Sequence, residues 1–211
     1  MKHNLPKPYL SYSAIDSWMK SPNQFRKRYY ENAPSFVTPE LNFGKKIADL
    51  LENKDESLAH IKQYATPEQQ VQVDIEGVPI FGYIDSFDPE TNSFYEFKTG
   101  RMPWTQKKVD KHLQLDIYSL CIEEIFGSVN DECMLIWMQT EKIDEPKVGL
   151  ITHEDSHGIR LTGEVTEFTR VITDEERENT RTLIARVAQE ISDDYTQYLD
   201  AKSKPKGLVG F

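Results

Sequence analysis

Asp85, Glu96 and Lys98 are the side chains of this sequence that best suit metal-dependent chemistry. Glu96 follows Asp85 by eleven residues, and Lys98 lies two residues further on. In a β-strand successive side chains alternate between two faces, so Glu96 and Lys98 point to the same side. Residues 89–92 predict a turn, and the resulting hairpin would bring Asp85 beside Glu96. Two carboxylates and a lysine on one surface can bind a hard divalent cation and activate a water molecule.

Each of these residues has an ordinary explanation when it is taken alone, because a strand-end Asp often forms a turn and a Glu-x-Lys pattern often lies at a solvated edge. Three motifs in order change this interpretation: Gly82-Tyr83-Ile84-Asp85, Glu96-Phe97-Lys98-Thr99-Gly100 and Gln114-Leu115-Asp116-Ile117-Tyr118. The sequence here resembles the RecB-like branch of the PD-(D/E)XK nucleases, in particular the stand-alone exonucleases of phages and bacteria. That family has G-x-x-D, a short hairpin, [D/E]-x-K-T-G and a helix with Q-x-x-x-Y.

The resemblance covers roughly residues 10–200 and implies a fold, a reaction and a metal site. The fold would be α/β, with a central mixed β-sheet flanked by helices as in restriction endonucleases. The reaction would be phosphodiester hydrolysis, with Asp85, Glu96 and the backbone carbonyl of Phe97 as metal ligands. Oxygen ligands suit Mg²⁺ or Mn²⁺. Lys98 would position the attacking water or stabilise the developing charge.

Gln114 and Tyr118 are four residues apart, so they share one face of a predicted helix. The ordinary explanation is a polar residue and an aromatic residue at the edge of the core. The resemblance implies instead that both are catalytic-site residues, which contact substrate phosphate or support Lys98. Asp116 points elsewhere and is expected to be structural.

One position departs from the family pattern. Related nucleases carry a His or Glu on the helix after a Pro-rich loop, in a pattern like F-G-x-x-x-H. Here the matching stretch begins at Phe43-Gly44 and ends at Ala48, and alanine cannot bind a metal. Glu52 lies one turn after Ala48 on the same face, and Asp49 is the next residue, so either can replace the missing ligand.

A second departure concerns iron–sulfur clusters. Several relatives bind one through a Cys before Pro near the N-terminus and three further cysteines near the C-terminus. This sequence has Ser21-Pro22 at that position, and its two cysteines, Cys121 and Cys133, are expected to be buried packing residues. The sequence therefore excludes an iron–sulfur cluster.

Charge is distributed unevenly, although the net charge of −10 argues against a nucleic-acid partner. Residues 1–48 hold eight Lys/Arg and three Asp/Glu, and residues 98–111 hold five Lys/Arg and one Asp/Glu. Residues 131–200, by contrast, hold seven Lys/Arg and seventeen Asp/Glu. Ordinary solvated helix faces explain this pattern, and so does a basic entrance for phosphates. The candidate substrate-binding residues are Arg26, Arg28, Lys45 and Arg101.

The 211 residues are expected to form one domain, with a helical segment at 10–40, the nuclease core at 41–200 and a mobile tail at 201–211. The helical segment would hold two short helices, begun by Ser13 and by Ser21-Pro22. Further helices are predicted at 41–53, at 103–126 and after Thr173. Strands are predicted at 71–75, 78–87, 93–97 and 132–140, with a hairpin or extension at 148–152 and 158–169.

The leading hypothesis is a metal-dependent DNA nuclease, an exonuclease of phage or bacterial recombination and repair. The alternatives are a nuclease-fold nucleic-acid-binding module without turnover, and a plain adaptor protein. DNA ends or single strands would be the substrate, because no G-x-x-x-x-G-K-[ST] helicase motif is present. A recombinase, a single-strand annealing protein or a helicase is the candidate protein partner. No membrane span or signal region is found, so a cytoplasmic location is expected in a bacterial or phage-infected cell.

Overall fold

The computed structural model describes residues 3–34, 37–143 and 158–203. The strands are β1 (Thr66–Ile75), β2 (Val78–Asp88), β3 (Ser93–Gly100), β4 (Glu132–Lys142) and β5 (Ile159–Val171). The α-helices are α1 (Tyr12–Lys20), α2 (Pro22–Tyr29), α3 (Pro39–Glu52), α4 (Gln106–Val109), α5 (Leu113–Phe126) and α6 (Asp174–Ser203), and a short 3-10 helix, η1, spans Glu56–Leu58.

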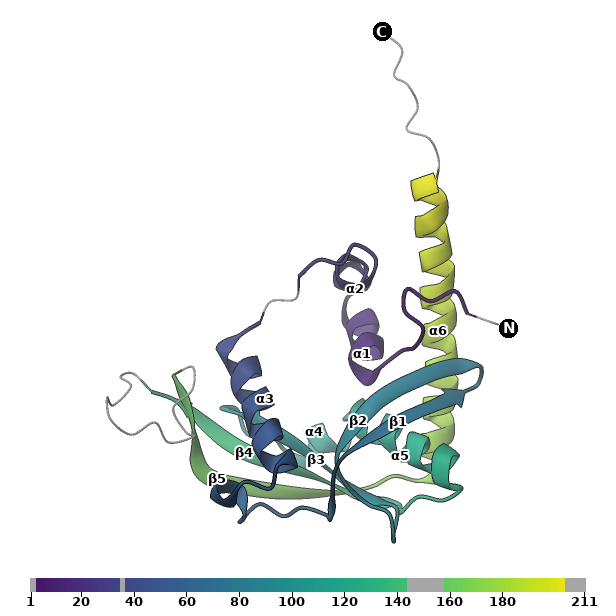
Figure 1. Cartoon of the computed structure of the whole chain (residues 1–211). Coiled ribbons are helices and arrows are strands. Elements are labelled where there is room, and N and C mark those ends of the chain that lie inside the picture. The colour runs from purple at the N-terminus through teal and green to yellow at the C-terminus, as the bar shows by residue number, and fades with distance from the viewer. Residues whose placement is uncertain (1–2, 35–36, 144–157, 204–211) are drawn as a thin grey trace.

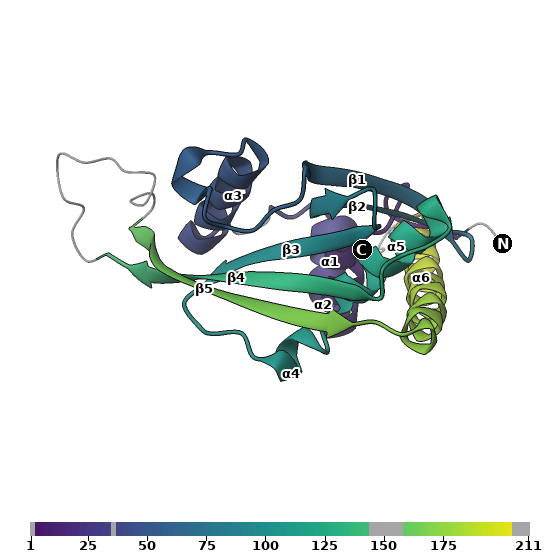
Figure 2. The same cartoon turned by 90° about the horizontal axis from the view of Figure 1, so that it is seen from below.

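The five strands form one mixed sheet in the order β1-β2-β3-β4-β5 (Figure 2). Only β3 and β4 are parallel, and the other neighbours are antiparallel. Helices α3 and α6 stand at opposite ends of the sheet, with α1 and α2 between them (Figure 1). The predicted α/β fold with a central mixed sheet is therefore confirmed.

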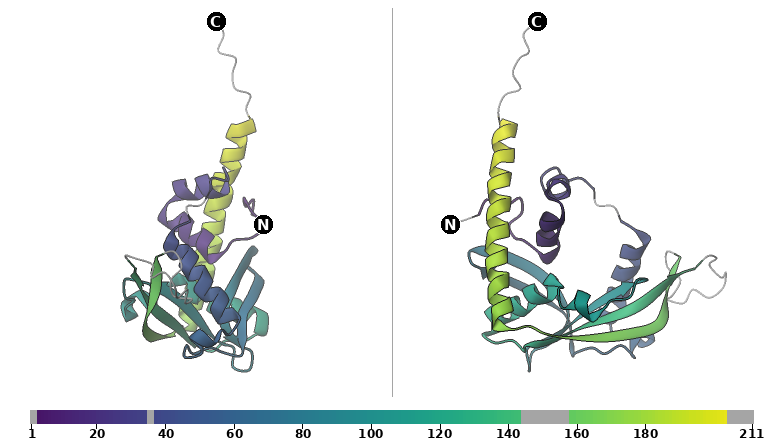
Figure 3. Two further views of the ribbon diagram at one scale, coloured as in Figure 1. Left: turned by 60° about the vertical axis from the view of Figure 1, so that its left-hand side comes forward. Right: turned by 180° about the vertical axis from the view of Figure 1, so that it is seen from behind.

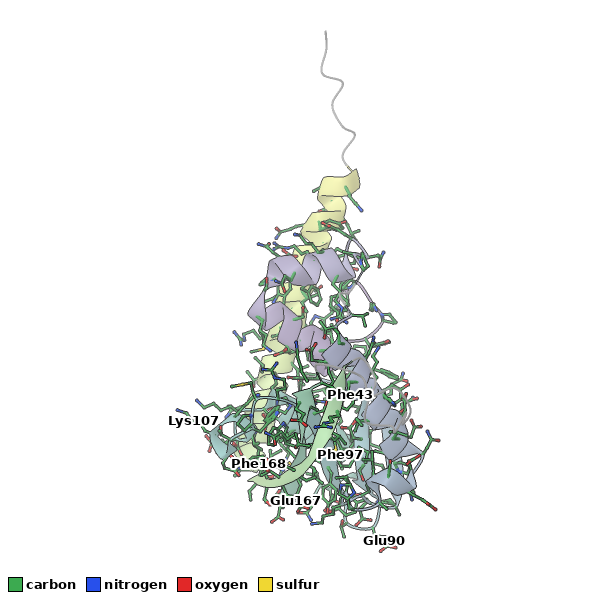
Figure 4. The ribbon with its side chains drawn as sticks, turned by 90° about the vertical axis from the view of Figure 1, so that its left-hand side faces the viewer. Phe43, Glu90, Phe97, Lys107, Glu167 and Phe168 are labelled. Atoms are coloured by element: carbon green, nitrogen blue, oxygen red, sulfur yellow. The ribbon has the colours of Figure 1, made fainter. Side chains whose placement is uncertain are left out.

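Two hydrophobic clusters lie on opposite faces of the sheet, because side chains alternate along β3 and β4. The larger cluster joins β1, β2 and the central strands to α1, α5 and α6 through Leu135, Trp137, Leu120 and Ile184, among others. The smaller cluster lies under α3 and contains Phe43, Ile47, Tyr95 and Ile136, with Phe97 packed against it. Figure 4 labels Phe43 and Phe97, which meet in this cluster.

Local signals account for several element boundaries. The Ser21 hydroxyl accepts a hydrogen bond from the Gln24 amide at 3.4 Å, with Pro22 as the first residue of α2. The helix predicted after Thr173 begins with a capping box, since Glu176 accepts from the Thr173 amide at 2.8 Å. The β1–β2 hairpin turns at Glu76-Gly77, both with positive φ, as a two-residue loop requires.

Two predictions about helices were wrong. The first helix is capped by Ser11 and not by Ser13, since the Ser11 hydroxyl accepts from the Ala14 amide at 3.3 Å. The single helix predicted at 103–126 is divided into α4 and α5. The Gln106 side chain donates to the Thr169 carbonyl of β5 at 2.8 Å, which holds α4 at the sheet edge while α5 packs into the core.

The ends of the chain add two observations. The predicted strand at 148–152 lies outside the described residues, as does the predicted tail beyond Ser203, whereas residues 201–203 continue α6. Helix α6 extends well beyond the rest of the molecule in both views of Figure 3. Across the described ranges, none of the helices is both long and apolar enough to span a membrane.

Candidate active site

Strands β2 and β3 pair over only three residues and then separate, which opens the sheet beside Asp85. Their pairing runs from Asp88 opposite Ser93 to Ser86 opposite Tyr95. Asp85 is the next residue of β2, and its carboxylate accepts a hydrogen bond from the Phe97 amide at 2.8 Å. A side chain thus satisfies a backbone donor that the neighbouring strand no longer reaches. This bond fixes Asp85 next to the Glu96-Phe97-Lys98 segment.

Glu96 is only 2% exposed and projects from β3 into the same opening. One of its carboxylate oxygens pairs with the Lys98 ammonium. The other, Oε2, is buried and has no hydrogen-bond partner among the described residues. Burial, with the nearby Asp85 charge as a second cause, raises the pKa of Glu96 to about 8. Burial likewise raises the pKa of Asp85, although Lys98 opposes that rise.

Lys98 is held by a chain of hydrogen bonds that reaches helix α5. Its ammonium donates to Gln114 Oε1 at 2.8 Å, and Gln114 Nε2 donates to the Tyr118 hydroxyl at 3.2 Å. Gln114 and Tyr118 are both buried, at 8% and 6% exposure. The structure thus brings together all five residues predicted as catalytic: Asp85, Glu96, Lys98, Gln114 and Tyr118.

Gly82 suits its position because Tyr118 packs directly against it. A Cβ atom at position 82 would lie 3.0 Å from Tyr118 Cε1 and 3.3 Å from its hydroxyl oxygen. The glycine of the G-x-x-D motif therefore lets α5 approach β2 closely enough for Tyr118 to support Gln114. In the same way, a Cβ at Gly44 would lie 3.2 Å from Thr99 Oγ1, so Gly44 allows α3 to approach the residue after Lys98.

A cleft of about 510 Å³ lies between α3 and the opened sheet. Asp85, Glu96 and Lys98 line it from the strands, and Lys45 and Ala48 line it from α3. Ala48, where the motif pattern predicts a His or Glu, therefore faces the cleft without a metal-binding side chain. Asp49 and Glu52 are not among the residues lining this cleft.

Glu68 is a carboxylate near the site that the sequence analysis missed. The β1–β2 register places it opposite Asp85, between the pairs Pro67–Ser86 and Gln69–Ile84, and its φ is +37°. Glu68 is exposed, but partial desolvation raises its pKa, and the charges of Glu52, Asp85 and Asp49 add to the rise. The stretch Thr66–Gln70 has no motif that marks Glu68, so only strand pairing reveals it.

The donors fit a hard cation, although the set supplied by side chains is small. In the described ranges, no three His, Cys, Asp or Glu side chains lie close enough to form a metal group by themselves. Asp85 and Glu96 provide two mutually repelling carboxylates, and Glu96 Oε2 is a buried acceptor without a partner. A cation that keeps several of its waters, as Mg²⁺ does, suits such a site.

The four predicted substrate-binding residues lie in different places. Lys45 lines the cleft between α3 and the sheet, and Arg101 is exposed. Arg28 lines a second cleft, which also contains Gln114 and Tyr118. Arg26 is held by Asp194 of α6, with its Nε 2.9 Å from one carboxylate oxygen. The structure thus brings Lys45 and Arg28 to the clefts and engages Arg26 in a contact between helices.

His112 is a second residue near the site that the sequence analysis did not single out. Its Nε2 is buried and has no hydrogen-bond partner among the described residues. Burial, followed by the Lys98 charge, lowers its pKa to about 4. His112 is therefore neutral at pH 7 and packs between Tyr12 and Trp104, with ring centroids 5.5 and 4.9 Å away.

Comparison with known proteins agrees with this geometry. A sequence model of the PD-(D/E)XK nuclease superfamily matches residues 45–203, and the chain belongs to that superfamily. This confirms the resemblance drawn from the motifs. A search of the curated proteins found no match.

Solved structures share the fold at low sequence identity. A protein from Eubacterium rectale has a TM-score of 0.54 and 9% identity, covering 96% of this chain and 91% of that one. A phage-related exonuclease from Haemophilus somnus has a TM-score of 0.51 and 11% identity, covering 89% of this chain and 82% of that one. An alkaline exonuclease from Laribacter hongkongensis has a TM-score of 0.51 and 12% identity, covering 93% of each chain. These likenesses concern the fold.

Proposed function

We propose that this nuclease-superfamily protein is a metal-dependent deoxyribonuclease, and specifically an exonuclease. The observation that carries the proposal is Glu96 Oε2, which is buried and has no hydrogen-bond partner in the part of the chain that the structure describes. It lies beside Asp85 and Lys98, and Gln114 holds Lys98 in place. A buried carboxylate oxygen without a donor is unfavourable in a protein that has no use for it.

Mg²⁺ or Mn²⁺ would be held by Asp85, Glu96 and the carbonyl of Phe97. When bound, such an ion lowers the pKa of its water and withdraws electrons from the phosphoryl oxygen. The choice of these two metals follows from the all-oxygen ligand set. Asp49 or Glu52 remains the predicted additional ligand. Glu68 is a third candidate, because the charges of Glu52, Asp85 and Asp49 all act on its carboxyl.

Lys98 provides the positive charge at the reacting phosphate. Its ammonium is oriented by Glu96 and Gln114, so it can donate to a phosphate oxygen or to the attacking water without first reorganising. Tyr118 keeps Gln114 in the orientation that presents Oε1 to Lys98. Gln114 and Tyr118 therefore act through Lys98 in this proposal.

A nucleic-acid-binding module without turnover is the second candidate function. Ala48 lines the cleft where relatives supply a ligand, and no third metal-binding side chain joins Asp85 and Glu96 in the described ranges. The hydrogen-bond chain from Lys98 to Tyr118 favours the enzyme, because substrate binding alone does not require it.

Recombination or repair in a phage or a bacterium is the proposed setting. The fold likeness to a phage-related exonuclease supports it. A recombinase, single-strand annealing protein or helicase remains the predicted partner, and the cytoplasmic location remains a prediction from the sequence.

The test is hydrolysis of end-labelled single- and double-stranded DNA with Mg²⁺ or Mn²⁺, by wild type and Lys98→Ala. We expect degradation by wild type, its loss in EDTA, and its loss in the variant. A covalently closed circular substrate is the control for the exonuclease assignment, since only an endonuclease cuts it. Calorimetric titration with Mn²⁺ gives a second readout, in which Glu96→Gln should weaken binding. If wild type binds Mn²⁺ but cuts no substrate, the binding module becomes the better description.

A further inference from the structure

A second cleft, larger than the catalytic one, lies on the other side of Gln114 and Tyr118. It encloses about 660 Å³, against about 510 Å³ for the catalytic cleft. Residues from the N-terminal segment, α1, α2 and β2 line it, and Gln114 and Tyr118 connect it to Lys98. We use the name aromatic cleft for this site, which is defined by Lys7, Tyr9, Arg28, Tyr29, Phe81 and Tyr83.

The cleft exists because β3 leaves β2, which frees one edge of β2 for the N-terminal segment. Leu10 pairs with Ile80 in a parallel bridge, donating to the Pro79 carbonyl at 2.8 Å and accepting from the Phe81 amide at 2.9 Å. This pairing fixes Tyr9 beside Phe81, with ring centroids 4.8 Å apart. The same strand separation that exposes Asp85 thus builds the aromatic cleft.

The aromatic rings form a continuous surface that leads toward the catalytic carboxylates. The Phe81 and Tyr83 rings lie 5.2 Å apart edge to face, and Tyr83 is 43% exposed. Phe81, Tyr83 and Asp85 are spaced two residues apart along β2, so their side chains lie on one face of the strand. An exposed tyrosine backed by a second ring is a suitable surface for stacking a base.

The charge of the cleft is opposite to the charge of the protein. The chain carries a net charge of −10, yet the described residues lining the cleft include Lys7 and Arg28 and no Asp or Glu. Both cations lie against the Tyr29 ring, with Lys7 Nζ 5.5 Å and Arg28 Cζ 5.4 Å from its centroid. Arg26, by contrast, is held by Asp194. The cleft therefore presents two cations to an anionic ligand.

We propose that the aromatic cleft binds an unpaired nucleic-acid strand and guides it to the catalytic cleft. Tyr83, Phe81 and Tyr9 would stack on bases, and Lys7 and Arg28 would contact phosphates. Rings that can stack on bases, together with cations that can contact phosphates, suit a single strand, because the bases of a duplex are already stacked on one another. This proposal rests on the proposed function and specifies its substrate as an unpaired end.

The first experiment measures binding of a fluorescent oligothymidylate and of a blunt duplex by anisotropy, using the full chain in EDTA. We expect Tyr83→Ala to weaken single-strand binding by about 5- to 100-fold, as loss of one stacked base does, whereas Tyr83→Phe should bind like wild type. Arg28→Ala should also weaken binding and should reduce its dependence on salt.

Two matched controls lie outside the cleft. Phe126 is as exposed as Tyr83, at 43%, and Lys27 is the exposed neighbour of Arg28 on α2. Phe126→Ala and Lys27→Ala should leave single-strand binding unchanged. The thermal midpoints of all variants show that each remains folded.

Wild-type affinity in both Tyr83→Ala and Arg28→Ala would overturn the proposal. An equal loss of single-strand and duplex binding would also overturn it, because the cleft would then not distinguish unpaired strands. These outcomes are separate from failure of the proposed function, which would appear as a wild-type chain that cuts no DNA but still binds single strands through Tyr83 and Arg28.

Discussion

Helix α5 contributes to two buried clusters of charge, and the clusters are built differently. Gln114 faces the proposed catalytic cluster, in which Asp85 and Glu96 share one cation, Lys98. Asp116, two residues later, faces Arg170 of β5 at 2.5 Å, and Arg170 also donates to the Val109 carbonyl at 3.2 Å. Asp116 is thus the structural residue that the sequence predicted.

The difference lies in how the burial of charge is compensated. In the structural cluster burial raises the pKa of Asp116 to about 6, and the charge of Arg170, which is only 5% exposed, is the largest cause after burial and opposes the rise, whereas Glu176 adds to it. In the catalytic cluster the charge of Asp85 is the largest cause after burial and adds to the rise, Lys98 opposes it, and the pKa of Glu96 reaches about 8. Similar burial therefore gives an ion pair between α5 and β5 at Asp116, and a carboxylate suited to accept a cation at Glu96.

The sharpest test of this comparison replaces one carboxylate in each cluster by its amide. Glu96→Gln should lower the rate of DNA hydrolysis by about 10³-fold or more, since it removes a proposed metal ligand and the partner of Lys98. Asp116→Asn should leave the rate within a few-fold of wild type. Rates on a labelled oligonucleotide with saturating Mn²⁺ measure both, and a similar loss in the two variants would show that the clusters are not distinct.

The reverse contrast is expected in stability. Arg170→Ala should lower the free energy of unfolding by about 3–5 kcal/mol, because it leaves the Asp116 carboxylate buried without its cation. Lys98→Ala should destabilise less, since Glu96 can take up a proton. Urea unfolding at pH 7 in EDTA measures both, and a larger loss in Lys98→Ala would contradict the comparison.

The catalytic cluster should also make stability depend on pH. A carboxyl with a raised pKa binds more protons in the folded chain than in the unfolded chain at pH values between its two pKa values. The free energy of unfolding should therefore fall as the pH rises from about 4.5 to about 8 in metal-free buffer. Glu96→Gln should flatten this dependence, and parallel curves for the two proteins would show that Glu96 does not titrate in this range.

The smallest predicted effect comes from a single methyl group. Gly82→Ala should push Tyr118 away from β2, cost about 1–3 kcal/mol of stability and reduce hydrolysis roughly tenfold, through Gln114 and Lys98. Gly163→Ala serves as a control for loss of a glycine, since a Cβ there meets nothing within 4 Å, although its positive φ adds strain. Unchanged activity in Gly82→Ala would mean that Tyr118 does not support the site.

The sequence determined the parts that depend on neighbouring residues. Alternation along β3 placed Glu96 and Lys98 on one face, and helical spacing placed Gln114 and Tyr118 together. The caps at Ser21 and Thr173 began their helices as predicted, because each is a contact within four residues. The order of the three motifs also predicted that two strands and a following helix contribute to the site.

Tertiary structure decided the parts that depend on residues far apart in the chain. Glu68 lies opposite Asp85 only through strand pairing, and Arg26 is engaged by a residue 168 positions away. The aromatic cleft joins Tyr9 to Phe81 because β3 leaves β2 after three paired residues. No local pattern specifies where a strand pair separates, since that point is set by which side chains fill the opened space.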